Sequence, residues 1–101
     1  MTKTHELKCW PGFFREIYEE RKRFEVRYND RDFHEGDELI LREWEPNAMK
    51  YTGRVIGCDV GFILPGGTFG IEKGFVVMSL MGIEEIDPTW SDSESNPIKV
   101  D

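Results

Sequence analysis

Apolar and polar residues alternate most regularly near the end of the first third of the chain, where Phe24, Val26 and Tyr28 are separated by single polar residues. This period is that of a β-strand with one buried face. We therefore expect the apolar side chains in the core and Glu25 and Arg27 together on the free face. Two residues on one face of a strand lie about 7 Å apart along the chain. A carboxylate and a guanidinium at that spacing can form an ion pair or contact one ligand from two sides.

The segment before this strand predicts a short strand and a helix. Residues 4–9 alternate weakly and precede a Trp-Pro-Gly turn, which is typical of a short strand. Pro11 favours the start of a helix directly after that turn. An apolar stripe at helical spacing should place this helix against the core; its members are Phe13, Phe14, Ile17 and Tyr18.

Three later segments are predicted to be strands, over residues 38–44, 54–64 and 75–81. Gly57 and Gly61 lie inside the second of them, and glycine within a strand indicates a bulge or a bend. The third segment lacks alternation, so we expect it to be buried on both faces. The residues expected in the core include Phe24, Val26, Leu39, Leu41, Val76 and Val77.

An early helix followed by strands without further helices predicts an α+β fold, a small mixed-sheet β-barrel with one principal helix near the N-terminus. A chain of 101 residues has the length of one domain. We assign this domain to residues 1–83. Residues 84–101 are predicted to form an acidic tail, extended or disordered, in which Trp90 is the best candidate for a docking residue.

The negative charge of the chain lies mostly in that tail. Of the net charge of -7, residues 84–101 contribute -5, from six carboxylates and one lysine, and the rest of the chain contributes -2. Tight non-specific binding of nucleic acid requires a basic footprint that releases counterions. Any binding of nucleic acid must therefore be local and selective.

The cysteines, the histidines and the N-terminus point to a cytoplasmic protein without a metal or cofactor. Cys9 and Cys58 are far apart and fit no disulfide or metal pattern, so we interpret them as buried thiols of a reducing compartment. No signal sequence and no apolar run of membrane length is present. His5 and Cys9 would suit a metal only on a helix, and no second ligand pair follows. His34, in a charged loop, is expected to be solvated, although it could titrate near neutral pH.

A glycine-rich loop over residues 64–74 could bring backbone amides close to a phosphate. No Lys-Ser or Lys-Thr follows it, as would be expected in a P-loop, and such loops are more often turns.

The run Lys22 to Arg27 resembles the signature of the ASCH group of the PUA-like superfamily, Gly-x-Lys-x-x-Glu-x-Arg. Lys22, Glu25 and Arg27 fill three of its four places, and Glu20 stands at the place of the glycine. The resemblance covers residues 5–81. Without it, charged residues on an exposed strand would be interpreted as solubilising groups that pair with one another.

Short matches in the same order are similar to a narrower ASCH-like family of bacteria and phages, a domain of unknown function. They lie at His5–Lys8, Asn29–Phe33, Gly36–Asp37, Leu41–Trp44 and Gly66–Gly70. This resemblance implies a PUA-like barrel, in agreement with the pattern of elements.

The resemblance further implies a polar cleft that binds RNA, a nucleoside or a nucleotide. Lys22 would contact a phosphate or act as a reactive amine, and Arg27 would hold a phosphate or a carbonyl. Glu25 would accept from an exocyclic amino group or orient Lys22. The candidates for an aromatic residue that stacks on the base are Tyr28, Trp10 and Trp44. The residues expected to bind the ligand are Lys22, Glu25, Arg27, Tyr28, Asp30, Arg31, Trp44, Gly67 and Thr68.

The main alternative is an enzyme. Some small ASCH proteins are amidohydrolases that remove an acyl group from a modified cytidine, and this resemblance would make Lys22 and Glu25 catalytic. Those enzymes have threonine at the place of Glu25. A nuclease is less favoured, because acid–base cleavage of RNA usually needs a histidine or a carboxylate pair. A protein-interaction module with an acidic tail is a further hypothesis. We expect a monomer that has no membrane partner.

Overall fold

The structure, a computed structural model, describes residues 2–86 and has the predicted α+β architecture. Its elements in chain order are β1 (Thr4–Cys9), α1 (Pro11–Tyr18), β2 (Phe24–Tyr28), β3 (Glu38–Glu45), β4 (Lys50–Pro65) and β5 (Phe75–Ile86). The helix and each of the five strands match a segment predicted from the sequence pattern. The expected fold class, a small mixed sheet with one helix near the N-terminus, is confirmed.

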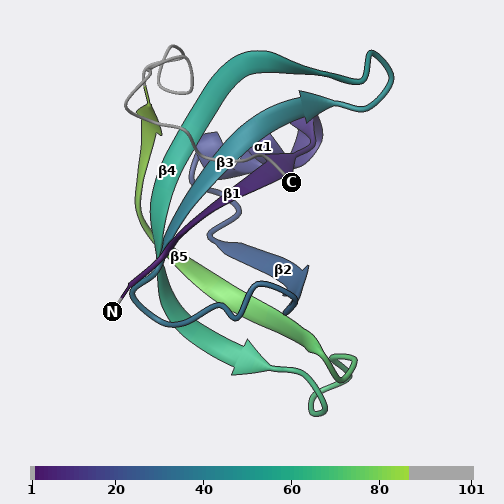
Figure 1. Ribbon diagram of the computed structural model, residues 1–101, viewed down its shortest axis with the longest axis vertical. Helices are drawn as coiled ribbons and strands as arrows, with labels where there is room; N and C mark the ends of the chain where they lie inside the picture. Colours follow the sequence, from purple (N-terminus) through teal and green to yellow (C-terminus); the bar gives the residue numbers. More distant parts are fainter. Residues whose placement is uncertain (1, 87–101) are drawn as a thin grey trace.

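The strands form one mixed sheet in the order β1-β3-β4-β5-β2. Strands β1 and β3 are parallel, and the other neighbours are antiparallel. The sheet curls into a half-barrel, with β1 and β2 as its two edge strands (Figure 1). Register shifts in the pairing of β4 with β5, between Gly57 and Asp59 and between Val60 and Ile63, allow the two long strands to bend. The bends predicted at Gly57 and Gly61 are therefore present.

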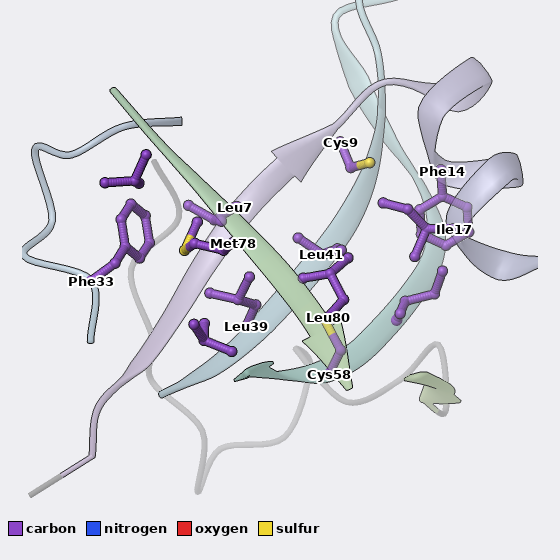
Figure 2. Packing of buried hydrophobic residues seen from close by; sticks show 13 residues of the cluster. Leu7, Cys9, Phe14, Ile17, Phe33, Leu39, Leu41, Cys58, Met78 and Leu80 are labelled. Carbon is purple, nitrogen blue, oxygen red and sulfur yellow. The ribbon is translucent and has the colours of Figure 1, made fainter. Parts of the chain in front are cut away.

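The core fills the concave side of the curled sheet. Phe14 and Ile17 of α1 point toward the strands, and Phe33 from the loop after β2 closes the other end (Figure 2). Leu39, Leu41 and Val76 belong to this core, as predicted. Its other members are Leu7, Cys9, Ile56, Cys58, Val60, Met78 and Leu80.

Strand β5 is buried on one face only, so the prediction for residues 75–81 is wrong in this respect. Val76, Met78 and Leu80 are buried, whereas Phe75, Val77 and Ser79 are half-buried. Among the described residues, α1 contacts β5, but no second layer covers the outer face of the sheet. An apolar run without alternation therefore does not require burial on both faces.

The helix buries a narrower stripe than its sequence predicts. Phe14 and Ile17 are fully buried, but Phe13 and Tyr18 are exposed. A helix of eight residues makes little more than two turns, and a spacing of three residues places only Phe14 and Ile17 on the line that faces the sheet. Phe13 and Tyr18 flank this line on either side.

The two faces of strand β2 are reversed relative to the prediction: its apolar face is the exposed one. Phe24, Val26 and Tyr28 are exposed, and Glu25 is buried. The register explains this, because Glu25 is paired with the core residue Met78 and therefore shares its face. A carboxylate can occupy this inner position because two cations neutralise it, as described below.

The last strand extends through Ile86, three residues beyond the end expected for the domain. There, Val55 of β4 is paired with Ile86. Residues 87–101, including Trp90, lie outside the described residues. No helix in residues 2–86 is long and apolar enough to cross a membrane.

Candidate functional site

The end of α1 positions the first residue of the site. The N–H of Arg21 donates to the C=O of Glu16, and the N–H of Glu20 donates to the C=O of Ile17, each at 2.9 Å. These two bonds form a Schellman motif, which normally has glycine at the position that Glu20 occupies. Glu20 has φ 59, the left-handed conformation that glycine adopts most readily. Glu20 therefore ends the helix, and this turn sets where the chain enters Lys22.

Glu25 lies between Lys22 and Arg27 and is bonded to both. Lys22 Nζ donates to Glu25 Oε1 at 3.0 Å, and Arg27 Nε donates to Glu25 Oε2 at 2.8 Å. The Glu25 side chain is 8% exposed, whereas those of Lys22 and Arg27 are 17% and 25% exposed. Each oxygen of a nearly buried carboxylate thus has a cationic donor, which is the condition for burying such a charge. We call these three residues the Glu25 cluster.

The two cations of the Glu25 cluster also hold backbone groups. Lys22 Nζ donates to the carbonyl of Phe24 at 2.8 Å, and Arg27 Nη2 donates to the carbonyl of Lys8 at 2.6 Å. Because Lys8 is in β1 and Arg27 is in β2, this contact joins the two edge strands of the half-barrel through a side chain. Arg31 makes a similar contact with the carbonyl of Glu6 at 3.1 Å. Two arginines therefore bridge from β2 and the loop after it to β1.

An open groove of about 750 Å³ lies between the end of β1, α1 and β2, and the Glu25 cluster lines it. This volume is in the range of small-molecule binding sites. Trp10 and Phe13 line the groove and are 56% and 57% exposed. Phe24 and Val26 of β2 complete its apolar walls. The groove thus combines a charged floor with aromatic walls that are open to solvent.

The groove is locally positive in an acidic protein. Four basic residues line it against two acidic ones, Lys8, Arg21, Lys22 and Arg27 against Glu16 and Glu25, although the Lys8 ammonium lies against the ring of Trp44 outside the groove. A hydrogen bond from Arg21 lowers the pKa of Glu16, so this carboxylate is ionised near neutral pH. Burial, together with the nearby Glu25 carboxylate, raises the pKa of the Cys9 thiol to about 12. Cys9 therefore lines the groove as a neutral, unreactive group.

The remaining residues predicted to bind the ligand lie outside this groove. Tyr28 is at the end of β2, exposed, with its ring edge against Phe75 at 5.5 Å between centroids. Asp30 is in the exposed loop that follows. Trp44 of β3 is half-buried against Tyr51, and the Lys8 ammonium lies 4.2 Å from the centre of its ring.

The glycine-rich loop connects β4 to β5 as a structural turn. The N–H of Gly66 donates to the carbonyl of Phe75, and that of Gly67 donates to the carbonyl of Ile71, each at 2.7 Å. Thr68 accepts, through its carbonyl, the N–H of Ile71. The amides of Gly66 and Gly67 thus already have acceptors, which leaves them unsuited to bind a phosphate.

Of the three aromatic candidates, Trp10 lines the groove, and the sequence pattern gave no reason to include Phe13 and Phe24. Phe13 belonged to the helical stripe expected in the core, and Phe24 to the face of β2 expected to be buried. Only Phe24, two residues after Lys22, could have been proposed from its proximity in the sequence, because Phe13 lies in the first turn of α1. In the structure, Lys22 Nζ lies 5.6 Å and 4.9 Å from the ring centres of Phe13 and Phe24.

His5 is part of a second buried polar cluster, distant in sequence from the first. Its Nε2 lies 2.8 Å from Asp37 Oδ2, and Asp37 also accepts the backbone N–H groups of Lys3 and His34. Burial alone would raise the pKa of Asp37, but the hydrogen bonds from His5, Lys3 and His34 outweigh it and lower that pKa. The pair holds the N-terminus and the loop before β3 together. No group of three metal-ligating side chains gathers within residues 2–86.

The chain belongs to a protein family described as a domain of unknown function, DUF3850, whose model matches residues 4–80. This span contains the Glu25 cluster and all residues that line the groove. The chain is also similar to an uncharacterized 12.9 kDa protein in the GpA 3′ region of Escherichia phage P2, with 41% identity over 56 residues. The matched segment is 55% of this chain and 50% of the phage protein. The chain therefore aligns with about half the length of this relative.

Proposed function

We propose that this protein binds RNA or another nucleotide-containing ligand in the groove above the Glu25 cluster. The observation that carries the proposal is a nearly buried carboxylate shared by two cations, at the floor of a groove whose walls are exposed aromatic rings. A cluster with a purely structural role would not need exposed aromatic walls. The spacing of Lys22, Glu25 and Arg27 also supports our proposal that the family is a branch of the ASCH group.

The cations of the cluster still have donors to offer a phosphate. Arg27 uses its Nε–H for Glu25 and one Nη2–H for the Lys8 carbonyl, which leaves its other N–H groups for a ligand. Lys22 uses two of its ammonium protons in the same way. Because each side chain is held at two points, its remaining donors are fixed in direction before the ligand arrives. Such preorganisation reduces the entropy lost on binding.

The aromatic walls would hold the base. Trp10 and Phe13 present exposed ring surface beside the cluster, and a base that stacks on such a ring gains about 1–3 kcal/mol. Each Glu25 oxygen retains accepting capacity beside its cationic donor, so the carboxylate could receive an exocyclic amino group. A base with an amino group, such as adenine, cytosine or guanine, should therefore bind more tightly than uracil.

The charge distribution favours a single-stranded or small ligand. The net charge of the chain is -7, yet cations exceed carboxylates by two among the residues that line the groove. An acidic surface repels the closely spaced phosphates of a duplex. A short anionic ligand in the groove meets mainly the local positive field.

A thermal-shift and calorimetric screen with AMP, CMP, GMP, UMP and short single-stranded RNAs tests the proposal. A ligand that binds only the folded form raises the melting temperature with its concentration. We expect a nucleotide with an amino group to do so, and Trp10→Ala to weaken its affinity by about 5- to 150-fold, the equivalent of about 1–3 kcal/mol. Phe62→Ala is the matched control, since Phe62 is an exposed aromatic residue outside the groove.

Two results would contradict the proposal. The first is that none of the nucleotides or RNAs raises the melting temperature. The second is that a ligand binds but loses the same affinity in Trp10→Ala and in Phe62→Ala, which would place it outside the groove.

The second candidate is an amidohydrolase that acts on an acylated nucleoside. The observation in its favour is that Lys22 Nζ and Glu25 Oε1, a proton donor and an acceptor, lie 3.0 Å apart beside the groove. Against it, Glu25 is nearly buried and stands where the similar amidohydrolases have threonine. Release of the free acid from N4-acetylcytidine, measured by chromatography and lost in Lys22→Met, would favour this activity.

A further inference from the structure

The outer face of β2 is apolar and continues beyond the groove. Phe24, Val26 and Tyr28 share this face and are 45%, 48% and 58% exposed. Phe24 and Val26 also line the groove, whereas Tyr28 lies one strand period further along. Residues two apart on one face of a strand lie about 7 Å from one another. Tyr28 thus shares one strand face with the groove residues Phe24 and Val26, and this strand, β2, is an edge of the sheet (Figure 1).

The Tyr28 ring is held in place although more than half of it is exposed. Its cross-strand partner is Phe75 of β5, and the two rings meet edge to face at 5.5 Å and 76°. The other contact is with Gly74, where an added Cβ would lie 2.8 Å from Tyr28 Cε1. The next residue, Asn29, donates its backbone N–H to the carbonyl of Gly74 at 2.8 Å. Tyr28 is therefore a fixed aromatic platform at the surface.

We propose that the ligand is a single strand of at least two nucleotides, with one base in the groove and the next stacked on Tyr28. This inference rests on the proposed function. Aromatic residues along exposed strands stack successive bases in several RNA-binding folds. Arg27 points to the other face of β2, toward Glu25 and the Lys8 carbonyl, so its remaining N–H groups serve the phosphate of the nucleotide in the groove.

A nucleic-acid strand fits this surface better than a protein segment does. A peptide would add to a free backbone edge of the sheet, but the carbonyl of Phe24 on β2 accepts from Lys22, and those of Glu6 and Lys8 on β1 accept from Arg31 and Arg27. The local excess of positive charge in the groove also matches the phosphates of a nucleic-acid strand.

The affinities of a mononucleotide, a dinucleotide and a trinucleotide of the same base test the inference. We expect the dinucleotide to bind at least about tenfold more tightly than the mononucleotide, because a second base gains stacking energy. Tyr28→Ala should abolish this gain, Tyr28→Phe should retain it, and Phe62→Ala should leave it unchanged. Calorimetry in a buffer of fixed ionic strength supplies the affinities, because binding to phosphates depends on salt.

The outcomes separate this inference from the proposed function. If mononucleotide and dinucleotide bind equally, or if the gain survives in Tyr28→Ala, the inference is wrong while the groove remains a nucleotide site. If neither binds, the proposed function itself fails. Sedimentation that shows a dimer which Tyr28→Ala dissociates would also overturn the inference, because the apolar face would then be an interface between two copies.

Discussion

The Glu25 cluster combines a structural and a candidate binding role in the same three side chains. Glu25 can be buried on the core face of β2 only because Lys22 and Arg27 bond to its two oxygens. Arg27 in turn ties β2 to the β1 carbonyl of Lys8. A change at any of these residues therefore affects folding as well as binding, and the two effects must be measured separately.

Glu25→Gln should destabilise the protein by about 2 kcal/mol, because it leaves two partly buried cations without their counter-charge while keeping the side-chain shape. Urea unfolding followed by circular dichroism measures this change. Glu20→Gln is the matched control, since Glu20 pairs with Arg23 at the surface, and we expect a change within about 0.5 kcal/mol. Equal effects of the two substitutions would show that the Glu25 cluster contributes no more than a surface pair.

The residue that ends α1 offers a second prediction. Glu20 adopts φ 59, which costs a residue with a side chain about 1–2 kcal/mol more than it costs glycine. Part of this stabilisation is offset, because glycine also raises the conformational entropy of the unfolded chain. We therefore expect Glu20→Gly to raise the free energy of unfolding by about 0.5–1 kcal/mol.

Glu20→Ala is the control for that substitution. It also removes the surface pair with Arg23 but keeps the Cβ atom in the left-handed conformation. If Glu20→Gly is no more stable than Glu20→Ala in urea unfolding, the left-handed backbone is not under strain.

At the scale of the elements, the sequence predicted the order of the helix and strands but not the faces of β2. Alternation shows that a strand has two different faces, and the usual rule places the apolar one inside. In β2 the register with β5 places Glu25 opposite Met78, on the core face. No local pattern contains this information, because it depends on the pairing with β5, which lies about 50 residues further along the chain. The bends of β4 were predictable, since glycine marks them directly.

The candidate site was likewise predictable only in part. Lys22, Glu25 and Arg27 were identified by their spacing, and the structure brings them together at one groove. Trp44, Asp30 and the Gly67–Thr68 turn were predicted to join them but lie outside that groove. The aromatic wall formed by Phe13 was missed, because helical periodicity assigns a stripe to the core without showing how narrow the buried part is. The sequence did not show which elements, distant from one another along the chain, come into contact.

The hairpin between β4 and β5 depends on Gly66. A Cβ at this position would lie 2.0 Å from the carbonyl oxygen of Glu72 and 2.9 Å from that of Phe75, so the backbone of the turn would have to move. We expect Gly66→Ala to lower the free energy of unfolding by about 2 kcal/mol or more. Urea unfolding measures the change.

Gly67→Ala and Gly12→Ala are the controls for Gly66. Gly67 has φ 99 and open space around it, so alanine there should cost only about 1 kcal/mol of backbone strain. Gly12 lies in α1, where an added Cβ meets no atom within 4 Å, and alanine should be neutral or stabilising by up to about 1 kcal/mol. The explanation by steric contact is wrong if Gly66→Ala costs no more than Gly67→Ala.

The whole molecule combines a local excess of positive charge in the groove with a net negative charge, much of which lies after Ile86. Residues 87–101 hold four carboxylates and one lysine, so their deletion changes the net charge from -7 to -4. The core described above is made by residues between Leu7 and Leu80. We therefore expect the free energy of unfolding of the chain 1–86 to lie within about 1 kcal/mol of that of the full chain. The deletion removes few groups able to bury apolar area.

The same deletion should strengthen the binding of an anionic ligand at low salt. Removing three net negative charges lowers the long-range repulsion of phosphates, and this effect should disappear in about 0.3 M salt, where exposed charges are screened within a few ångströms. Affinities of one short RNA for both chains at 0.05 and 0.3 M salt, with urea unfolding alongside, measure the two effects. Trp90→Ala in the full chain is the control, because it removes the ring without changing the charge. If the deletion and Trp90→Ala both lower the free energy of unfolding by several kcal/mol, Trp90 is instead a structural anchor of the fold.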